Sequence, residues 1–174
     1  MEISVIIVNY NVKYLLEKCL YSVQAALRNI PGEIIIVDNN STDGSKEYLQ
    51  PRFPSVNFCW ENTNHGFSKA NNIGLKISKG DFVLFLNPDT IIPENAISDC
   101  LSMLKKESSL GALGVKMISG NGSYLKESKR GFPSPATSMF RMLGLTKIFP
   151  RADKVKLLFR KAPVESMILF FFAV

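Results

Sequence analysis

The chain has 174 residues, of which 46% are hydrophobic and 21% charged, enough for one α/β domain with a substantial core and too few for two ordinary domains. Its three cysteines lie far apart, which excludes a disulfide scaffold and a cysteine zinc site and is typical of a reducing compartment. The net charge of +6 arises in residues 121–174. We expect no secretory signal at the start of the sequence. We also expect no membrane span, since no apolar run reaches ~18 residues.

Short apolar runs alternate with amphipathic segments over the first 120 residues. The apolar runs predict strands, and apolar residues at helical spacing predict the helices between them. In chain order, we expect strands at 3–8, 33–37, 56–60, 81–86 and 112–118, and helices at 14–27, 45–49, 68–77 and 94–106, the last starting at Pro93. Beyond them, 139–149 is a candidate helix, and the run 167–174 is a candidate core strand that would form an exposed, aggregation-prone edge as a free terminus.

This alternation predicts an α/β fold, a mostly parallel sheet with helices on both faces. In such sheets, ligands bind beyond the carboxyl ends of the strands. Polar loops begin there at Asn9, Asp38, Asn62 and Asn87, and are rich in Asn and Asp. Such side chains bind base or ribose groups, and a carboxylate can also hold a divalent cation.

Several common catalytic motifs are absent. The sequence has no GxGxxG after its first strand, no GxxxxGK[ST] and no GxSxG, which argues against a dinucleotide-binding dehydrogenase, a P-loop NTPase and an α/β-hydrolase. The single histidine, His65, argues against a Ser-His-Asp triad, and we interpret it as a solvated loop residue.

Four stretches carry a family resemblance. They are VIIVNYN (5–11), IVDNNSTDG (36–44), NHGFSKANNIG (64–74) and LFLNPDT (84–90), in this order and with suitable spacing. Together they resemble the N-terminal part of family 2 glycosyltransferases, inverting enzymes with a Rossmann-like GT-A fold. The resemblance covers about residues 1–135. It implies a donor-binding α/β core over residues 1–120 and a basic, incomplete acceptor-side segment over residues 121–174.

The resemblance also implies roles for individual residues. Asn9 and Tyr10 would flank the nucleotide base, and Asp38 would hydrogen-bond a pyrimidine. The remaining residues would contact the sugar, ribose and diphosphate of a UDP- or dTDP-sugar: Asn64, Gly66 and Phe67 border the nucleotide and sugar, Asn87 faces the ribose, and Asp89 coordinates Mg²⁺ or Mn²⁺. The metal would stabilise the charge of the departing nucleoside diphosphate.

The sequence departs from the family pattern in two ways. Asn87 replaces the first acid of the DxD motif, as in the NPD, rhamnosyltransferase-like subgroup. No residue matches the family's general base, which an inverting transfer needs to deprotonate the acceptor hydroxyl. We therefore expect a C-terminally truncated glycosyltransferase; the alternative is a donor-binding module without catalytic activity.

Residues 121–174 contain 10 basic and 3 acidic residues. Three interpretations stay open: a solvated face, peripheral contact with an anionic membrane, and nucleic-acid binding. No nucleic-acid motif supports the third, so we expect none as a partner. A glycan or lipid-linked acceptor, as in cell-surface polysaccharide synthesis, would fit a cytoplasmic protein at the inner face of the membrane.

Overall fold

The computed structural model describes residues 1–107, 109–115 and 170–173. The chain forms two compact units, one made of Met1–Gly114 with Leu169–Val174 and the other of Val115–Ile168. All elements described below belong to the first unit. The candidate helix at 139–149 and almost all of the basic segment lie outside the described residues, and the division at residue 120 stays a prediction.

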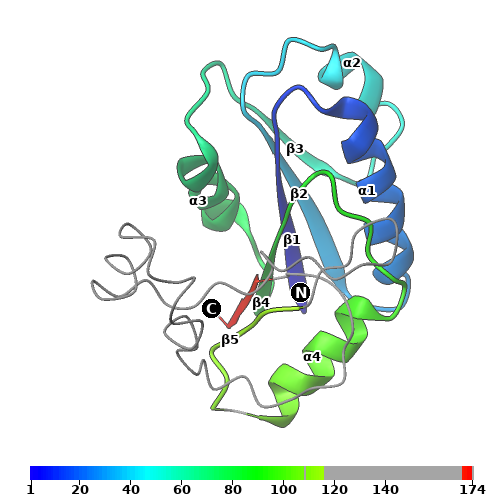
Figure 1. The fold of residues 1–174 in the computed structure, drawn as a ribbon, viewed down its shortest axis with the longest axis vertical. Coiled ribbons are helices and arrows are strands. Elements are labelled where there is room, and N and C mark those ends of the chain that lie inside the picture. Colours follow the sequence, from blue (N-terminus) through cyan, green and yellow to red (C-terminus); the bar gives the residue numbers. More distant parts are fainter. Residues whose placement is uncertain (108, 116–169, 174) are drawn as a thin grey trace, which may run out of the picture. The chain divides into compact units, whose positions relative to one another are not determined.

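A central sheet organises the first unit (Figure 1). In the described residues it has six strands in the order β3-β2-β1-β4-β6-β5. Strands β1 to β4 are parallel, and β6 runs antiparallel to both of its neighbours. The strands are β1 (Ile3–Asn9), β2 (Gly32–Asp38), β3 (Asn57–Trp60), β4 (Phe82–Leu86), β5 (Ala112–Leu113) and β6 (Phe170–Ala173).

Helices cover both faces of this sheet, as predicted. They are α1 (Lys13–Ala26), α2 (Ser45–Leu49), α3 (Phe67–Ile77) and α4 (Ala96–Lys106). Figure 1 shows α3 on one side of the sheet and α1 and α4 on the other. On the α3 side, Ala70 packs with alternate residues of the central strands, among them Ile6, Ile35 and Val83. Because successive strand residues point to opposite faces, the fully buried β1 needs apolar residues at nearly every position.

Three predicted elements begin later than expected, and one of them, β4, begins only one residue later, at Phe82. Helix α4 starts at Ala96 and not at Pro93, because Pro93 lies in a turn closed by a hydrogen bond from Ala96 N to its carbonyl oxygen (3.1 Å). Strand β3 starts at Asn57, since the Val56 N–H bonds the Phe53 carbonyl in a turn. The strand predicted at 112–118 is limited to Ala112–Leu113 among the described residues.

The apolar run at 167–174 forms a strand of the sheet over Phe170–Ala173, as predicted. The expectation of an exposed edge is wrong, because β6 lies between β4 and β5 and pairs with both. Its β4 side is paired along Phe170–Ala173, and its β5 side is paired at Phe171 and Phe172.

At the amino-terminal edge of the sheet, a buried polar cluster joins three strands. The Ser4 hydroxyl donates to Glu33 Oε1 at 2.7 Å, and the Lys79 N–H donates to the same oxygen at 2.7 Å. Gly80 N donates to Ser4 Oγ at 2.9 Å just before β4. Ser4 and Glu33 are buried, so these bonds satisfy polar groups that would otherwise be costly to bury.

Candidate functional site

A cleft of about 470 Å³ opens at the carboxyl-terminal edge of the parallel strands. From β1 the chain passes to β2 on one side, and β4 later pairs with the other side of β1. Ligands of α/β sheets bind at such a reversal of strand order. Six of the eight predicted site residues line this cleft: Tyr10, Asn64, Gly66, Phe67, Asn87 and Asp89.

Five further lining residues were not singled out from the sequence: Val8, Val12, Leu15, Asn39 and Pro88. Asn39 carries a usable sequence signal, because it follows the end of β2 in the same polar loop as Asp38. Leu15 carries none. It lies in the first turn of α1 and is 46% exposed, which its place in an apolar helical pattern did not indicate.

The other two predicted residues, Asn9 and Asp38, lie buried side by side at the ends of β1 and β2 and do not line the cleft. Asn9 Nδ2 donates to Asp38 Oδ2 at 2.6 Å, and Ser41 N donates to Asp38 Oδ1 at 2.8 Å. Asn9 Nδ2 also approaches Ser45 Oγ (2.9 Å), while Asn9 Oδ1 is buried without a hydrogen-bond partner among the described residues. Contact of Asp38 with a base stays a prediction.

The loop after β2 is bound to the start of α1 through Asp43. Its carboxylate accepts from Lys13 N (3.1 Å), Ser45 N (3.0 Å) and Ser45 Oγ (2.6 Å). Burial raises the pKa of Asp43, but the bonds from Ser45 and Lys13 and the Lys13 charge outweigh it, so the pKa lies below 3.8. In the same pair of loops, Asn11 and Asn40 adopt positive φ angles of 56° and 66°, which Asn tolerates better than most residues.

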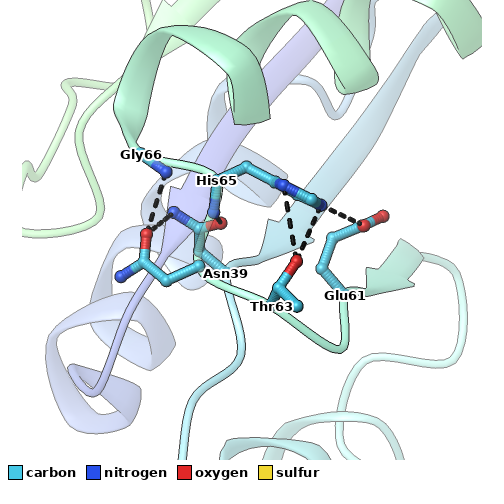
Figure 2. Close-up of polar contacts among 6 residues, drawn as sticks. Asn39, Glu61, Thr63, His65 and Gly66 are labelled. Carbon is cyan, nitrogen blue, oxygen red and sulfur yellow. Dashed lines mark hydrogen bonds and ion pairs between the residues drawn. The ribbon is translucent and has the colours of Figure 1, made fainter.

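Two side-chain amides connect the loops after β2 and β3 (Figure 2). Backbone His65 N donates to Asn39 Oδ1 at 2.8 Å, and Gly66 N donates to Asn64 Oδ1 at 2.9 Å. These backbone donors fix both amides, so that Asn39 Nδ2 faces and donates to Asn64 Oδ1 at 2.7 Å. Asn39 thus uses both ends of its amide, whereas the Asn64 NH₂ has no partner among the described residues and is available to a ligand.

His65 is not the solvated loop residue that we expected. Its side chain is 23% exposed, and Nε2 lies 3.0 Å from Glu61 Oε2. Thr63 Oγ1 lies within 3.4 Å of both ring nitrogens, as Figure 2 shows. The ring therefore stabilises the loop between β3 and α3, while its neighbours Asn64 and Gly66 line the cleft.

The loop after β4 brings Asn87 and Asp89 to the cleft as exposed side chains. Helix α1 lies behind it: Cys19 Sγ donates to the Asn87 carbonyl (3.7 Å), and Ile92 N donates to Ser22 Oγ (3.1 Å). Burial and then the nearby negative charge of Asp89 raise the pKa of Cys19 to about 12, despite an opposing hydrogen bond from the Thr90 backbone. The Cys19 thiol is consequently neutral at physiological pH.

Asp89 is the only acidic side chain that lines the cleft among residues 1–107, 109–115 and 170–173. The same residues contain no group of three His, Cys, Asp or Glu side chains that could enclose a metal ion. One carboxylate fits Mg²⁺ or Mn²⁺ when phosphate oxygens and waters supply the other ligands. The site therefore suits a cation that arrives with a phosphorylated ligand.

The helices in the described part of the chain include none with the length and apolar character needed to cross a bilayer.

The parallel sheet, its flanking helices and the cleft beside β1 define an α/β nucleotide-binding type of fold. Residues 4–167 match the model of Glycosyl transferase family 2, and the chain belongs to this family. The structure resembles that of residues 1–349 of Staphylococcus aureus TarS in complex with UDP-GlcNAc, with a TM-score of 0.60 and 28% identity over 77% of this chain and 37% of the other. The fold is thus of the GT-A type, as predicted.

Two curated relatives are glycosyltransferases that act on poly(ribitol-phosphate). The β-glucosyltransferase of Bacillus spizizenii is 32% identical over 158 residues, which are 86% of this chain and 25% of the relative. The β-N-acetylglucosaminyltransferase TarP of S. aureus is 28% identical over 91% of this chain and 52% of the relative. The chain therefore spans between a quarter and about half of the length of these relatives.

Proposed function

We propose that the cleft binds a nucleoside-diphosphate sugar and that the protein transfers the sugar to an acceptor hydroxyl with inversion. The observation that carries the proposal is the meeting of Tyr10, Asn64, Phe67 and Asp89 at the strand reversal beside β1. The similarity to TarS, whose structure contains UDP-GlcNAc, supports a UDP-sugar as donor.

Different residues of the cleft would contact different chemical groups of the ligand. Tyr10 and Phe67, 49% and 60% exposed, offer aromatic surface for the base and sugar. The free NH₂ of Asn64 would donate to an oxygen of the ligand. Asp89 would hold Mg²⁺ or Mn²⁺, and this cation supplies stabilisation of the charge on the leaving diphosphate.

Titration calorimetry with UDP and Mn²⁺ tests the donor site. We expect Asp89→Ala to weaken Mn²⁺-dependent UDP binding by at least about tenfold, as for loss of a charged ligand contact. Asp81→Ala is the matched control, since Asp81 is also exposed but lies before β4, at the opposite edge of the sheet. Equal UDP affinity in wild type and Asp89→Ala would refute the metal role of Asp89.

A second candidate is donor binding without transfer. It is favoured by the cleft chemistry, because Asp89 is the only acid lining the described cleft and would be occupied by the cation. Incubation with radiolabelled UDP-glucose or UDP-GlcNAc and poly(ribitol-phosphate) separates the two. Labelled polymer supports transfer, whereas UDP binding without product supports the binding module; dTDP-rhamnose in parallel tests the rhamnosyltransferase-like assignment.

We also propose that the basic residues 121–174 bind an anionic membrane at the cytoplasmic face, near a lipid-linked acceptor. Their 10 basic against 3 acidic residues support this. Flotation of the full chain should occur with anionic and not zwitterionic vesicles. The triple change Arg151→Glu, Lys154→Glu, Lys156→Glu should abolish it, and Lys76→Glu on α3 should not. Retained flotation of the triple variant would contradict the proposal.

A further inference from the structure

The loop that carries Asp89 has its backbone bound to α1. Between the end of β4 and the start of α4, the side chains of Asn87 and Asp89 are exposed, and neither forms a hydrogen bond with another residue in the described part of the chain. Inside the loop, Thr90 N donates to the Asn87 carbonyl (3.2 Å), which closes a tight turn around Asp89. The position of the Asp89 carboxylate therefore depends on what fixes the backbone of this turn.

Cys19 contacts both ends of the turn. Its thiol donates to the Asn87 carbonyl at 3.7 Å, and the Thr90 backbone N–H lies near enough to the sulfur to oppose the rise in the thiol pKa. The thiol is buried, and the Asp89 carboxylate is near enough for its charge to act on the sulfur. A neutral S–H group is suited to this place, because it can donate to the carbonyl while accepting from the amide.

Ser22 lies one helical turn further along α1, on the same face as Cys19. Its hydroxyl donates to the Cys19 carbonyl at 2.8 Å and accepts from Ile92 N at 3.1 Å. Thr90 and Ile92 are both buried, so the loop has little room to move away from the helix. Cys19 thus holds the loop at Asn87, and Ser22 holds it at Ile92.

We propose that Cys19 and Ser22 are positioning residues, which place the Asp89 carboxylate where it can coordinate a divalent cation together with the diphosphate of the donor. This inference rests on the proposed function. Neither side chain lines the cleft, so both act through the loop backbone and touch no ligand. Residues that orient a metal ligand in this way commonly change metal affinity about 10–100-fold when they are removed.

The proposed role of Cys19 and Ser22 predicts a distinct pattern of Mn²⁺ requirements among variants. Cys19→Ala and Ser22→Ala should raise the Mn²⁺ concentration needed for half-maximal UDP binding by about tenfold. UDP affinity in EDTA should not change. Cys19→Ser should restore the Mn²⁺ requirement to within about twofold of wild type, because a hydroxyl can also donate to the Asn87 carbonyl and accept from a nearby amide.

Matched controls separate positioning from general stability. Cys100 in α4 is as deeply buried as Cys19, and its pKa is likewise raised to about 12, but it has no hydrogen bond to the loop. Ser98 donates to the Asn95 carbonyl as Ser22 does to that of Cys19, but accepts no loop amide. Cys100→Ala should lower the melting temperature and leave the Mn²⁺ requirement unchanged, and Ser98→Ala should change neither.

The experiment is calorimetric titration of the full-length variants with UDP over a series of Mn²⁺ concentrations. Electron paramagnetic resonance of free Mn²⁺ and thermal melting accompany it. An unchanged Mn²⁺ requirement in Cys19→Ala and Ser22→Ala, or an equal rise in Cys100→Ala, would overturn the positioning role while the proposed function stands. Absence of Mn²⁺-dependent UDP binding in the wild type would overturn both.

Discussion

The side-chain amide of Asn64 has one polar end left for a ligand. Its Oδ1 accepts from Asn39 Nδ2 and Gly66 N, which leaves the NH₂ group as a pure donor at the cleft. Asn64→Asp keeps the shape and both accepted bonds but removes the donor and adds a negative charge. We expect UDP affinity to fall by at least about tenfold, the cost of an unmade hydrogen bond to a charged group.

Calorimetry with UDP and Mn²⁺ measures this effect, and the melting temperature shows whether the fold is kept. Asn62→Asp is the control, since Asn62 is exposed in the same loop but does not line the cleft. If both variants bind UDP like the wild type, Asn64 donates nothing to the ligand.

Asp43 makes the stability of the site loops depend on pH. Its folded-state pKa lies below 3.8 despite the opposing effect of burial, because Ser45 and Lys13 stabilise the carboxylate. A depressed pKa contributes stability that is present above about pH 4 and is lost as the pH falls through the folded-state value. Asp43→Asn should therefore lower the free energy of unfolding by about 1 kcal/mol at pH 7.

Urea unfolding of both proteins at pH 7 and at pH values below 3.8 measures the difference. The wild type should lose its advantage over Asp43→Asn as the pH falls. An advantage that stays constant over this range would show that protonation of Asp43 is not linked to folding.

At the scale of single elements, Gly80 allows β4 to begin directly beside β1. A Cβ at this position would lie 2.4 Å from Ser4 N and 2.5 Å from Ile3 C, which are backbone atoms that cannot turn aside. Gly80→Ala should therefore destabilise the protein by about 1–3 kcal/mol, as overpacking does. Gly111→Ala is the control, because a Cβ there meets nothing within 4 Å. Denaturant unfolding compares them, and equal stability would contradict a tight β1–β4 contact.

Most elements could be predicted because their periodicity is strong. The apolar runs predicted β1, β2 and β4 to within one or two residues, and the polar loop before Ser45 predicted α2. The start of α4 could not be predicted, since a Pro suits both a helix start and the turn that it occupies here. The strand at Phe170–Ala173 was expected, but its neighbours were not, because apolar content does not identify a strand's partners.

At the scale of the whole molecule, the sequence motifs identified the loops that form the site, and the structure shows how their side chains are arranged. The family resemblance implies that Asn9 and Asp38 contact a nucleotide, which stays a prediction, and the structure adds that both side chains lie buried. Their mutual hydrogen bond depends on the parallel register of β1 and β2, which no local pattern encodes. The supporting role of Cys19 behind Asp89 could not be predicted from the sequence either, because a cysteine at apolar spacing in a helix is interpreted as a core residue.

A ligand held by loops after β1, β2, β3 and β4 should stabilise the molecule as a whole. These loops are far apart in sequence, and each lines the cleft through at least one residue. Binding only to the folded state adds about 2.7 kcal/mol when UDP is at about 100 times its Kd. UDP with Mn²⁺ should therefore raise the melting temperature by several degrees, EDTA should reverse the rise, and Asp89→Ala should show a clearly smaller rise at the same UDP concentration. The same rise in EDTA would mean that the nucleotide binds without a cation and that Asp89 has another role.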